Sequence, residues 1–195
     1  MSGRRPRAAP RSPGTPRSTR APRSRRQWGW HRLDDAHARR FVVTSGVGPG
    51  DLVLDLGAGD GAITCHLVRV GARVIAFELH PSRAARLRDR FADHRVKVVG
   101  ADITDLRLPG RSFRVVANPP FDGVSAVLDR LTHPASRLER ADLIVPRAVA
   151  RRWQERLRRG SPWQLDVETS MPRSAFTPRP RIDVCHISIR PGSTR

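Results

Sequence analysis

The sequence predicts a doubly wound α/β domain with a mostly parallel β-sheet and helices on both faces. Short apolar, β-branched segments alternate with amphipathic segments along most of the chain. This alternation is typical of a parallel sheet that is covered on both sides. The last two apolar segments, 163–170 and 182–190, have no helix between them. We therefore expect them to form an antiparallel pair at one edge of the sheet.

The expected elements follow one another in a regular order. Apolar residues at helical spacing predict a first helix over 34–45, which the segment GVGPG then ends. The expected strands of the parallel part are 51–56, 73–79, 95–100, 113–117 and 141–145. The other expected helices are 62–71, 82–92, 124–131 and a last helix that runs to Arg158.

The first 26 residues differ from the rest in composition. They contain nine arginines and no acidic residue, among many Pro, Ser, Thr, Gly and Ala. Such a segment buries too little surface to offset the entropy of ordering, so we expect a disordered basic arm over 1–26 and one folded domain over 27–195. The arm either binds RNA non-specifically or is only a solubilising tail or the product of an upstream start codon.

The chain of 195 residues carries a net charge of +19, almost wholly from arginine, since Lys97 is its only lysine. A guanidinium group binds phosphate in a bidentate manner and stacks on bases better than an ammonium group does. Nucleic acid is therefore the first partner to consider. The alternative is that the arginines reflect genomic base composition and form a solvated surface.

Cysteine usage and hydropathy exclude several classes of protein. Cys65 and Cys185 lie far apart without CxxC spacing, which indicates neither a disulfide framework nor a zinc site, and we expect no metal. No stretch approaches the roughly 20 apolar residues that span a bilayer, and the N-terminus lacks the apolar core of a secretory signal. We expect a soluble cytoplasmic protein.

A glycine-rich turn follows the first strand of the expected sheet. In LVLDLGAGDGAIT, Gly57 and Gly59 lie at the carboxyl end of this strand, where an open α/β sheet binds nucleotide-like ligands. Glu78 ends the next strand, at a position from which a carboxylate can accept both ribose hydroxyls. Asp102 follows the third strand and can bind an adenine amino group. The alternative is a tight structural turn, with Glu78 and Asp102 merely exposed.

The spacing of this turn discriminates between nucleotides. The dinucleotide fingerprint is G-x-G-x-x-G, whereas this turn reads G-A-G-D-G and places Asp60 where a pyrophosphate would lie. Repulsion between the two negative groups disfavours a dinucleotide. A cofactor with a ribose and an adenine but no phosphate fits better, and S-adenosylmethionine is such a cofactor.

The segment VVANPPFDG, residues 115–123, ends a buried strand with an amide, two prolines and an aromatic ring. The side-chain carbonyl of Asn118 and the backbone carbonyl of Pro119 can together accept both N–H groups of an exocyclic amine. The nitrogen lone pair is then free to point at a methyl donor. The ring of Phe121 offers a stacking face to a base. The alternative is a proline-capped strand with Phe121 in the core.

These motifs resemble those of the adenine-N6 methyltransferases, and among them the ribosomal RNA adenine dimethyltransferase superfamily. That superfamily includes the macrolide-resistance (Erm) enzymes and the housekeeping small-subunit dimethyladenosine transferases. The resemblance extends from residue 28 to about 190. The segments that carry it are DLGAGDGAIT (55–64), FELHP (77–81), ADI (101–103), NPPF (118–121) and AFTPRPRIDV (175–184).

The resemblance implies a Rossmann-like S-adenosylmethionine-dependent methyltransferase domain and assigns roles to its residues. It implies that Gly57 and Gly59 line the cofactor, Glu78 binds its ribose, Asp102 its adenine, Asn118 both the cofactor and the target amine, and Phe121 with Phe176 the flipped base. The family's Gln-Asn-Phe-Leu motif is matched loosely by residues 30–33, which implies cofactor contacts for His31 and Leu33. The segment WGWHRL can instead be an aromatic plug or an RNA contact.

Two departures from the family pattern qualify the resemblance. Phe121 stands where the family often has tyrosine. The sequence stops five residues after HISIR, where both branches usually continue into a helical RNA-binding domain. The chain thus resembles a truncated member of the resistance branch, and we expect a monomer that binds 23S rRNA through its arm and through Arg151, Arg152, Arg158 and Arg159.

The leading hypothesis is therefore methylation of an adenine N6 in 23S rRNA, which gives resistance to macrolides, lincosamides and streptogramin B. Within the same class, the small-subunit rRNA enzyme and a DNA adenine methyltransferase stay open. From a different class, a non-catalytic RNA-binding or ribosome assembly protein on the same fold also stays open. A dehydrogenase is disfavoured by Asp60.

Overall fold

The structure is a computed structural model that describes residues 31–158 and 160–192. The expected basic arm, the Trp28 to Trp30 part of the N-terminal motif, and Arg159 lie outside the described residues. The predictions that concern them remain predictions. None of the described helices is long and apolar enough to cross a bilayer.

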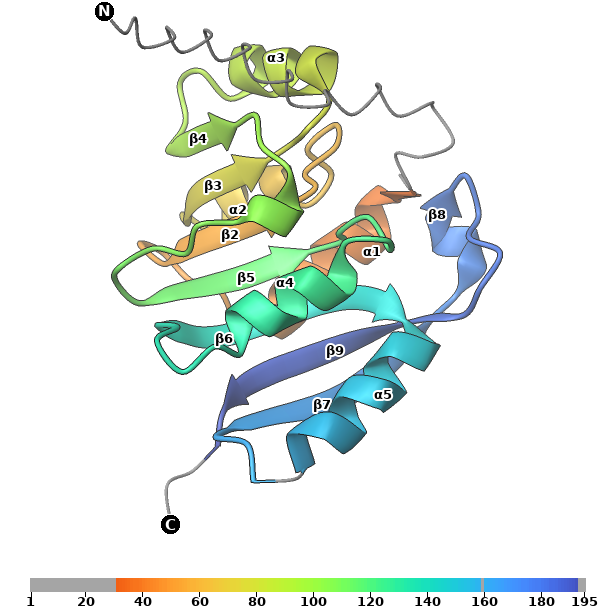
Figure 1. The fold of residues 1–195 in the computed structure, drawn as a ribbon. Coiled ribbons are helices and arrows are strands. Elements are labelled where there is room, and N and C mark those ends of the chain that lie inside the picture. The colour runs from red at the N-terminus through yellow and green to blue at the C-terminus, as the bar shows by residue number, and fades with distance from the viewer. Residues whose placement is uncertain (1–30, 159, 193–195) are drawn as a thin grey trace, which may run out of the picture.

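The central feature is a seven-stranded sheet with the strand order β4-β3-β2-β5-β6-β9-β7 (Figure 1). Neighbouring strands from β4 to β6 are parallel, and β9 is antiparallel to both β6 and β7. This confirms the doubly wound fold and the antiparallel pair at one edge. The strands are β2 (Leu52–Leu56), β3 (Arg73–Phe77), β4 (Val96–Val99), β5 (Phe113–Ala117), β6 (Leu138–Pro146), β7 (Trp163–Met171) and β9 (Val184–Pro191).

Helices follow the strands as the alternating pattern predicts. Helix α1 begins where the Asp34 carboxylate accepts the backbone N–H of His37 at 2.8 Å, and it ends at Gly46, which has a φ of 66°. Helix α2 is shorter than expected, because the glycine-rich turn continues to Ile63. The helices are α1 (Asp35–Ser45), α2 (Thr64–Arg69), α3 (Pro81–Arg90), α4 (Val124–Leu131) and α5 (Arg147–Arg158), with short 3-10 turns η2 (Ile103–Asp105) and η3 (Arg173–Ala175).

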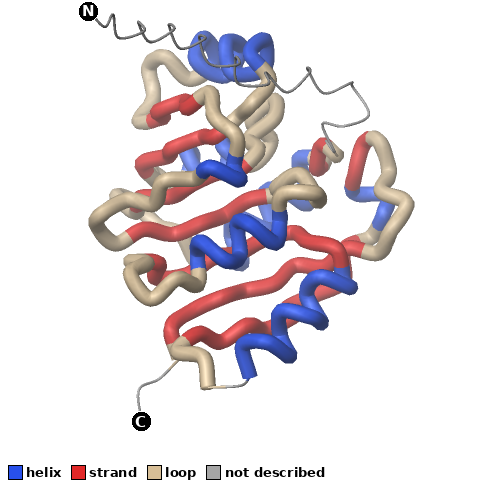
Figure 2. The backbone as a smooth tube through the Cα atoms, in the orientation of Figure 1, coloured by secondary structure: helices blue, strands red, loops and turns tan. Residues whose placement is uncertain are grey.

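The sheet separates two apolar cores, one on each face. Successive residues of a strand point to opposite faces, and Leu54 of β2 packs with α4 and α5 whereas Val53 packs with α1, α2 and α3. Figure 2 shows α4 and α5 in front of the sheet. By the same alternation Asp55 faces the side of α1 and α2. A carboxyl group is thereby buried inside an apolar layer, next to the end of its strand.

A second, two-stranded sheet was not expected from the sequence. Strand β1 (Arg32–Leu33) pairs antiparallel with β8 (Phe176–Thr177), with Leu33 opposite Phe176. The N–H of Asp34 also donates to the carbonyl of Ala175 at 2.9 Å. This pairing joins the N-terminal motif to the FTPRP segment near the carboxyl ends of the parallel strands (Figure 1).

Candidate active site

The glycine-rich turn after β2 packs directly against the NPPF segment after β5. Gly57 has a φ of 80°, and its N–H and that of Ala58 both donate to the Phe77 carbonyl at 2.9 Å. A Cβ atom at Gly57 would lie 2.7 Å from Cδ of Pro120. Only glycine satisfies both the left-handed backbone and this close approach. The two motifs therefore form one site through direct contact.

A small open hollow lies beside this contact, at the carboxyl ends of β2 and β5. It brings together four residues to which the sequence assigned cofactor contacts: His31, Leu33, Gly57 and Asn118. The N-terminal motif, whose match to the family is loose, thus lies against the pocket. The hollow is lined by His31, Arg32, Leu33, Asp55, Gly57, Ala58, Ala62, Ile63 and Asn118.

Glu78 lies at the end of β3 and is buried. Its Oε2 atom accepts the N–H of Gly59 at 2.9 Å, which fixes the glycine-rich turn. Its Oε1 atom accepts the N–H of His80 at 2.7 Å and Nη2 of Arg83 at 3.0 Å. A carboxylate offers about four acceptor sites, so three are occupied. To accept two ribose hydroxyls as well, Glu78 must give up one of these three hydrogen bonds. The Arg83 guanidinium is the one donor of the three that belongs to a side chain.

Asp102 follows β4 and caps the 3-10 turn η2. Its Oδ1 atom accepts both the backbone N–H and the hydroxyl of Thr104, each at 2.9 Å. These bonds hold the carboxylate at the edge of the sheet where an adenine is expected. Asp102 does not line the hollow around Asn118, so its contact with adenine remains a prediction.

Asp55 is a buried titrating group that no sequence motif indicated. It is buried, and its Oδ2 atom accepts the hydroxyl of Thr64 at 2.6 Å. The pKa of Asp55 is raised to about 7, because burial and the nearby charge of Glu78 raise it more than the hydrogen bond from Thr64 lowers it. The residue therefore titrates near neutral pH beside the cofactor hollow.

The side-chain amide of Asn118 makes a hydrogen bond through its nitrogen but none through its oxygen among the described residues. Its Nδ2 atom donates to the backbone carbonyl of His31 at 2.7 Å. Its Oδ1 atom is buried and has no hydrogen-bond partner among the described residues. A buried acceptor without a partner costs about 1–3 kcal/mol, so the site favours a ligand that donates a hydrogen bond there. An exocyclic amine is such a donor.

The two phenylalanines assigned to the flipped base lie in different surroundings. Phe121 is partly buried, and one of its faces is covered by the ring of His31, with the ring centroids 5.3 Å apart at an interplanar angle of 25°. Phe176 is only 2% exposed, because its strand pairs with β1 and the ring packs in the core with Leu33. Phe176 therefore offers no free face to a base in this conformation, and its contact with a flipped base remains a prediction.

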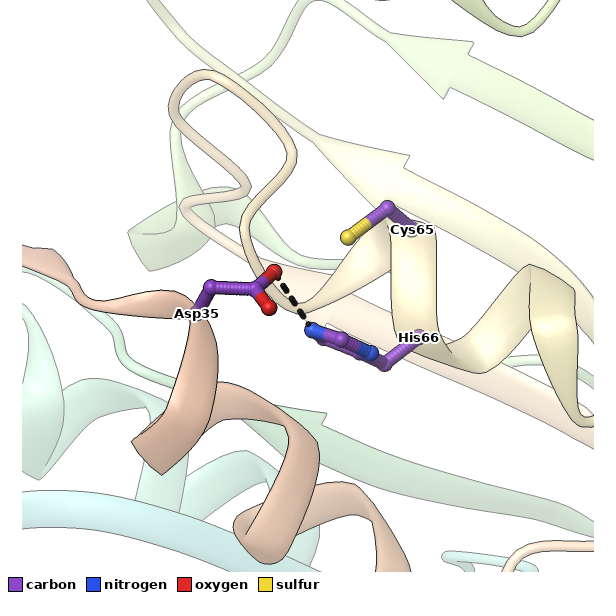
Figure 3. A group of neighbouring side chains, drawn as sticks. All are labelled: Asp35, Cys65 and His66. Carbon is purple, nitrogen blue, oxygen red and sulfur yellow. Dashed lines mark hydrogen bonds and ion pairs between the residues drawn. The ribbon is translucent and has the colours of Figure 1, made fainter.

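One group of side chains has the donor types that a metal ion requires. The ligand atoms of Asp35, Cys65 and His66 lie within 4.8 Å of one another (Figure 3). However, Nη1 of Arg69 lies 3.3 Å from Nδ1 of His66, and a guanidinium can only donate. The ring therefore carries its proton on Nε2 and donates it to Asp35, 3.0 Å away. This arrangement is a hydrogen-bonded contact between α1 and α2.

The sheet order, the glycine-rich turn and the polar residues at the strand ends define an S-adenosylmethionine-dependent methyltransferase fold. A solved structure titled 23S rRNA methyltransferase ErmE has the same fold, with a TM-score of 0.72 and 26% sequence identity. The similarity covers 83% of this chain and 70% of that one. It confirms the predicted fold class and the cofactor that goes with it.

The family is shown by the sequence comparison. Residues 23–195 match the model of the ribosomal RNA adenine dimethylase family, and the chain belongs to this family. An rRNA methyltransferase of Streptomyces thermotolerans is 34% identical over 162 residues, which are 77% of this chain. A ribosomal RNA small subunit methyltransferase A of Rhodococcus opacus is 39% identical over 137 residues, or 65% of this chain. The chain spans 53% and 46% of these two relatives, about half of their length.

Proposed function

We propose that this chain transfers a methyl group from S-adenosylmethionine to the N6 amine of an adenine in ribosomal RNA. The observation that carries this proposal is the Asn118 amide. Its nitrogen is held by the His31 carbonyl, and its buried oxygen has no hydrogen-bond partner among the described residues, so it is an acceptor that needs a donor. An amide with this orientation suits an amine with two N–H groups.

The residues around Asn118 act by position. Its Oδ1 atom and the Pro119 carbonyl accept the two amine protons, which leaves the nitrogen lone pair directed at the methyl group. The N–H of Gly123 donates to the Pro120 carbonyl at 3.0 Å, so the loop is fixed before a base arrives. Such alignment contributes several of the roughly 7–11 kcal/mol that proximity can supply. The methylated nitrogen then releases one proton to solvent.

S-adenosylmethionine, when bound, supplies an electrophilic methyl group on its sulfonium. The residues present fit this cofactor, because Glu78 and Asp102 follow β3 and β4 at the same edge of the sheet as the hollow beside Gly57, and residues 57–63 of the glycine-rich turn include no cation that could bind a phosphate. Asp60, within that turn, is instead paired with Arg86 at 3.1 Å. Glu78 would hold the ribose and Asp102 the adenine, while Leu33 would cover one side.

The substrate we favour is 23S rRNA, with resistance to macrolides, lincosamides and streptogramin B as the consequence. The similarity to the ErmE structure and to the Streptomyces protein supports this choice. The Rhodococcus relative, at a higher identity over a shorter segment, supports the second candidate, a small-subunit rRNA adenine dimethyltransferase. Both candidates use the same site on the same kind of amine.

Expression in a macrolide-sensitive bacterium tests the proposal and separates the two candidates. We expect raised resistance together with methylated adenine in 23S rRNA, mapped by primer extension and mass spectrometry. Methylation confined to 16S rRNA would support the second candidate. The matched control is Asn118→Ala, which should abolish methylation.

A cofactor titration distinguishes an enzyme from a non-catalytic RNA-binding protein. Calorimetry should show that S-adenosylmethionine binds the wild-type chain, with weaker binding by Gly57→Ala. An absence of binding by the wild-type chain, with RNA binding retained, would support the non-catalytic protein.

A further inference from the structure

His31 contacts two motifs that lie far apart in the sequence, NPPF (118–121) and the FTPRP segment. Its backbone carbonyl accepts Nδ2–H of Asn118 at 2.7 Å, its ring stacks on Phe121, and its Nδ1 atom lies 2.7 Å from the carbonyl of Pro178. A carbonyl oxygen only accepts, so Nδ1 carries a proton and donates it to Pro178. The ring of His31 is therefore held on one side by a hydrogen bond and on another by a stacked ring.

We propose that His31 is a positioning residue that sets the orientation of the Asn118 amide. The anchored ring prevents the His31 backbone from turning, and this keeps its carbonyl oxygen against Nδ2 of Asn118. A flipped amide would place Oδ1 against that carbonyl, and two acceptors repel each other. The same flip would turn the NH₂ group toward the site, where the substrate amine also needs acceptors. His31 thus selects the one amide orientation that can bind an amine.

The surroundings of the amide support this role. Among the described residues, the Asn118 side chain makes one hydrogen bond, the bond to His31, so no second hydrogen bond fixes the orientation of the amide. The FTPRP segment holds His31 in place through backbone atoms. The Pro178 carbonyl accepts a hydrogen bond from Nδ1 of His31, and β8 pairs with β1. The catalytic consequence rests on the proposed function, whereas the amide orientation is a property of the chain itself.

The sequence offers a direct probe of the orientation, because Asn118 is the only asparagine in the chain. Labelling with side-chain ¹⁵N-asparagine gives a single NH₂ group in NMR spectra. In the wild-type chain we expect one of its two protons to exchange slowly with solvent. His31→Ala should accelerate that exchange by about tenfold, the change that corresponds to about 1.4 kcal/mol of lost hydrogen bonding.

Further variants separate positioning from folding. His31→Asn should restore slow exchange, because an asparagine Nδ2 is as many bonds from the backbone as the histidine Nδ1 and can donate to Pro178. The second NH₂ signal of this variant is assigned by adding Asn118→Ala. His31→Phe keeps the stacked ring and loses this hydrogen bond, so it should fall between wild type and His31→Ala. His133→Ala, a substitution at an exposed histidine beyond α4, is the matched control and should leave the exchange unchanged.

Kinetics distinguish this role from a simple contact with the cofactor. We expect His31→Ala to lower kcat by about tenfold at saturating cofactor, with His31→Asn close to wild type. Unchanged amide exchange in His31→Ala, or a rise in KM for the cofactor alone, would overturn the proposal. Slow exchange in a wild-type chain that transfers no methyl group would instead overturn the proposed function and leave the orienting role standing.

Discussion

Gly57→Ala tests whether contact between the two motifs forms the site. The substitution combines two costs that can be separated. Alanine at a φ of 80° costs about 1–2 kcal/mol. Its Cβ atom would also lie 2.7 Å from Cδ of Pro120, two residues after Asn118, so the proline ring or the glycine-rich turn must shift. Overpacking of this kind costs about 1–3 kcal/mol. The sum is about 2–5 kcal/mol of unfolding free energy.

The matched control for this substitution is Gly50→Ala. Gly50 has a φ of 84°, but a Cβ atom there meets nothing within 4 Å. The backbone cost and the change in unfolded-chain entropy are thus common to both variants, and the difference isolates the contact with Pro120. Urea unfolding should show Gly57→Ala less stable than Gly50→Ala by about 1–3 kcal/mol, with methyl transfer abolished only in the former. Equal stability and equal activity would refute the reasoning.

Four other predictions test separate parts of the molecule. The folded pKa of Asp55, about 7, lies above its usual 3.8, so its stabilising contribution is full below 3.8 and is lost as pH rises through 7. The unfolding free energy of the wild-type chain should therefore fall by up to about 3 kcal/mol between pH 5 and 8, and Asp55→Asn should remove this fall. Parallel curves of unfolding free energy against pH for the two chains would contradict this. Phe121→Tyr should transfer methyl groups at close to the wild-type rate and Phe121→Ala much more slowly; small equal effects would mean that the ring is only core. Phe176→Ala should lower the unfolding free energy by about 3–5 kcal/mol, and full stability without activity would return this ring to the base-binding site. Deletion of 1–26 should reduce the logarithmic salt slope of RNA binding by about 0.7–0.9 for each phosphate group that the arm neutralises, and an unchanged slope would exclude the arm from binding.

Much of the fold was predictable because its signals are local. The spacing of apolar residues along the chain predicts the alternation of strands and helices. Two consecutive apolar segments with no helix between them indicated the antiparallel pair. The glycine-rich turn and NPPF were predictable for the same reason, since their residue types are unusual at the end of a buried strand. Their joint position followed from the rule that parallel strands end at one edge of the sheet.

Features that depend on distant partners were not predictable from local pattern. Strands β1 and β8 are two residues long, and a segment of that length shows no periodicity. The buried carboxylate of Asp142 offers a second example. It accepts a hydrogen bond from Nε2 of His186 at 2.8 Å and pairs with the guanidinium of Arg140, and these two partners are what allow a charge inside the sheet. Burial raises the pKa of Asp142, but the hydrogen bonds to Arg140 and His186 outweigh it and hold that pKa below its usual value.

The different surroundings of Phe121 and Phe176 show what a motif can and cannot specify. Both rings lie in proline-rich segments that resemble family signatures, and the resemblance gave both the same role. Phe121 follows a strand that ends at the hollow, whereas Phe176 forms a strand that closes over Leu33. The FTPRP segment therefore acts in this structure by holding residues 31–33 in place. A substitution in this segment should first lower the stability and weaken cofactor binding. It should alter the choice of base only through these two effects.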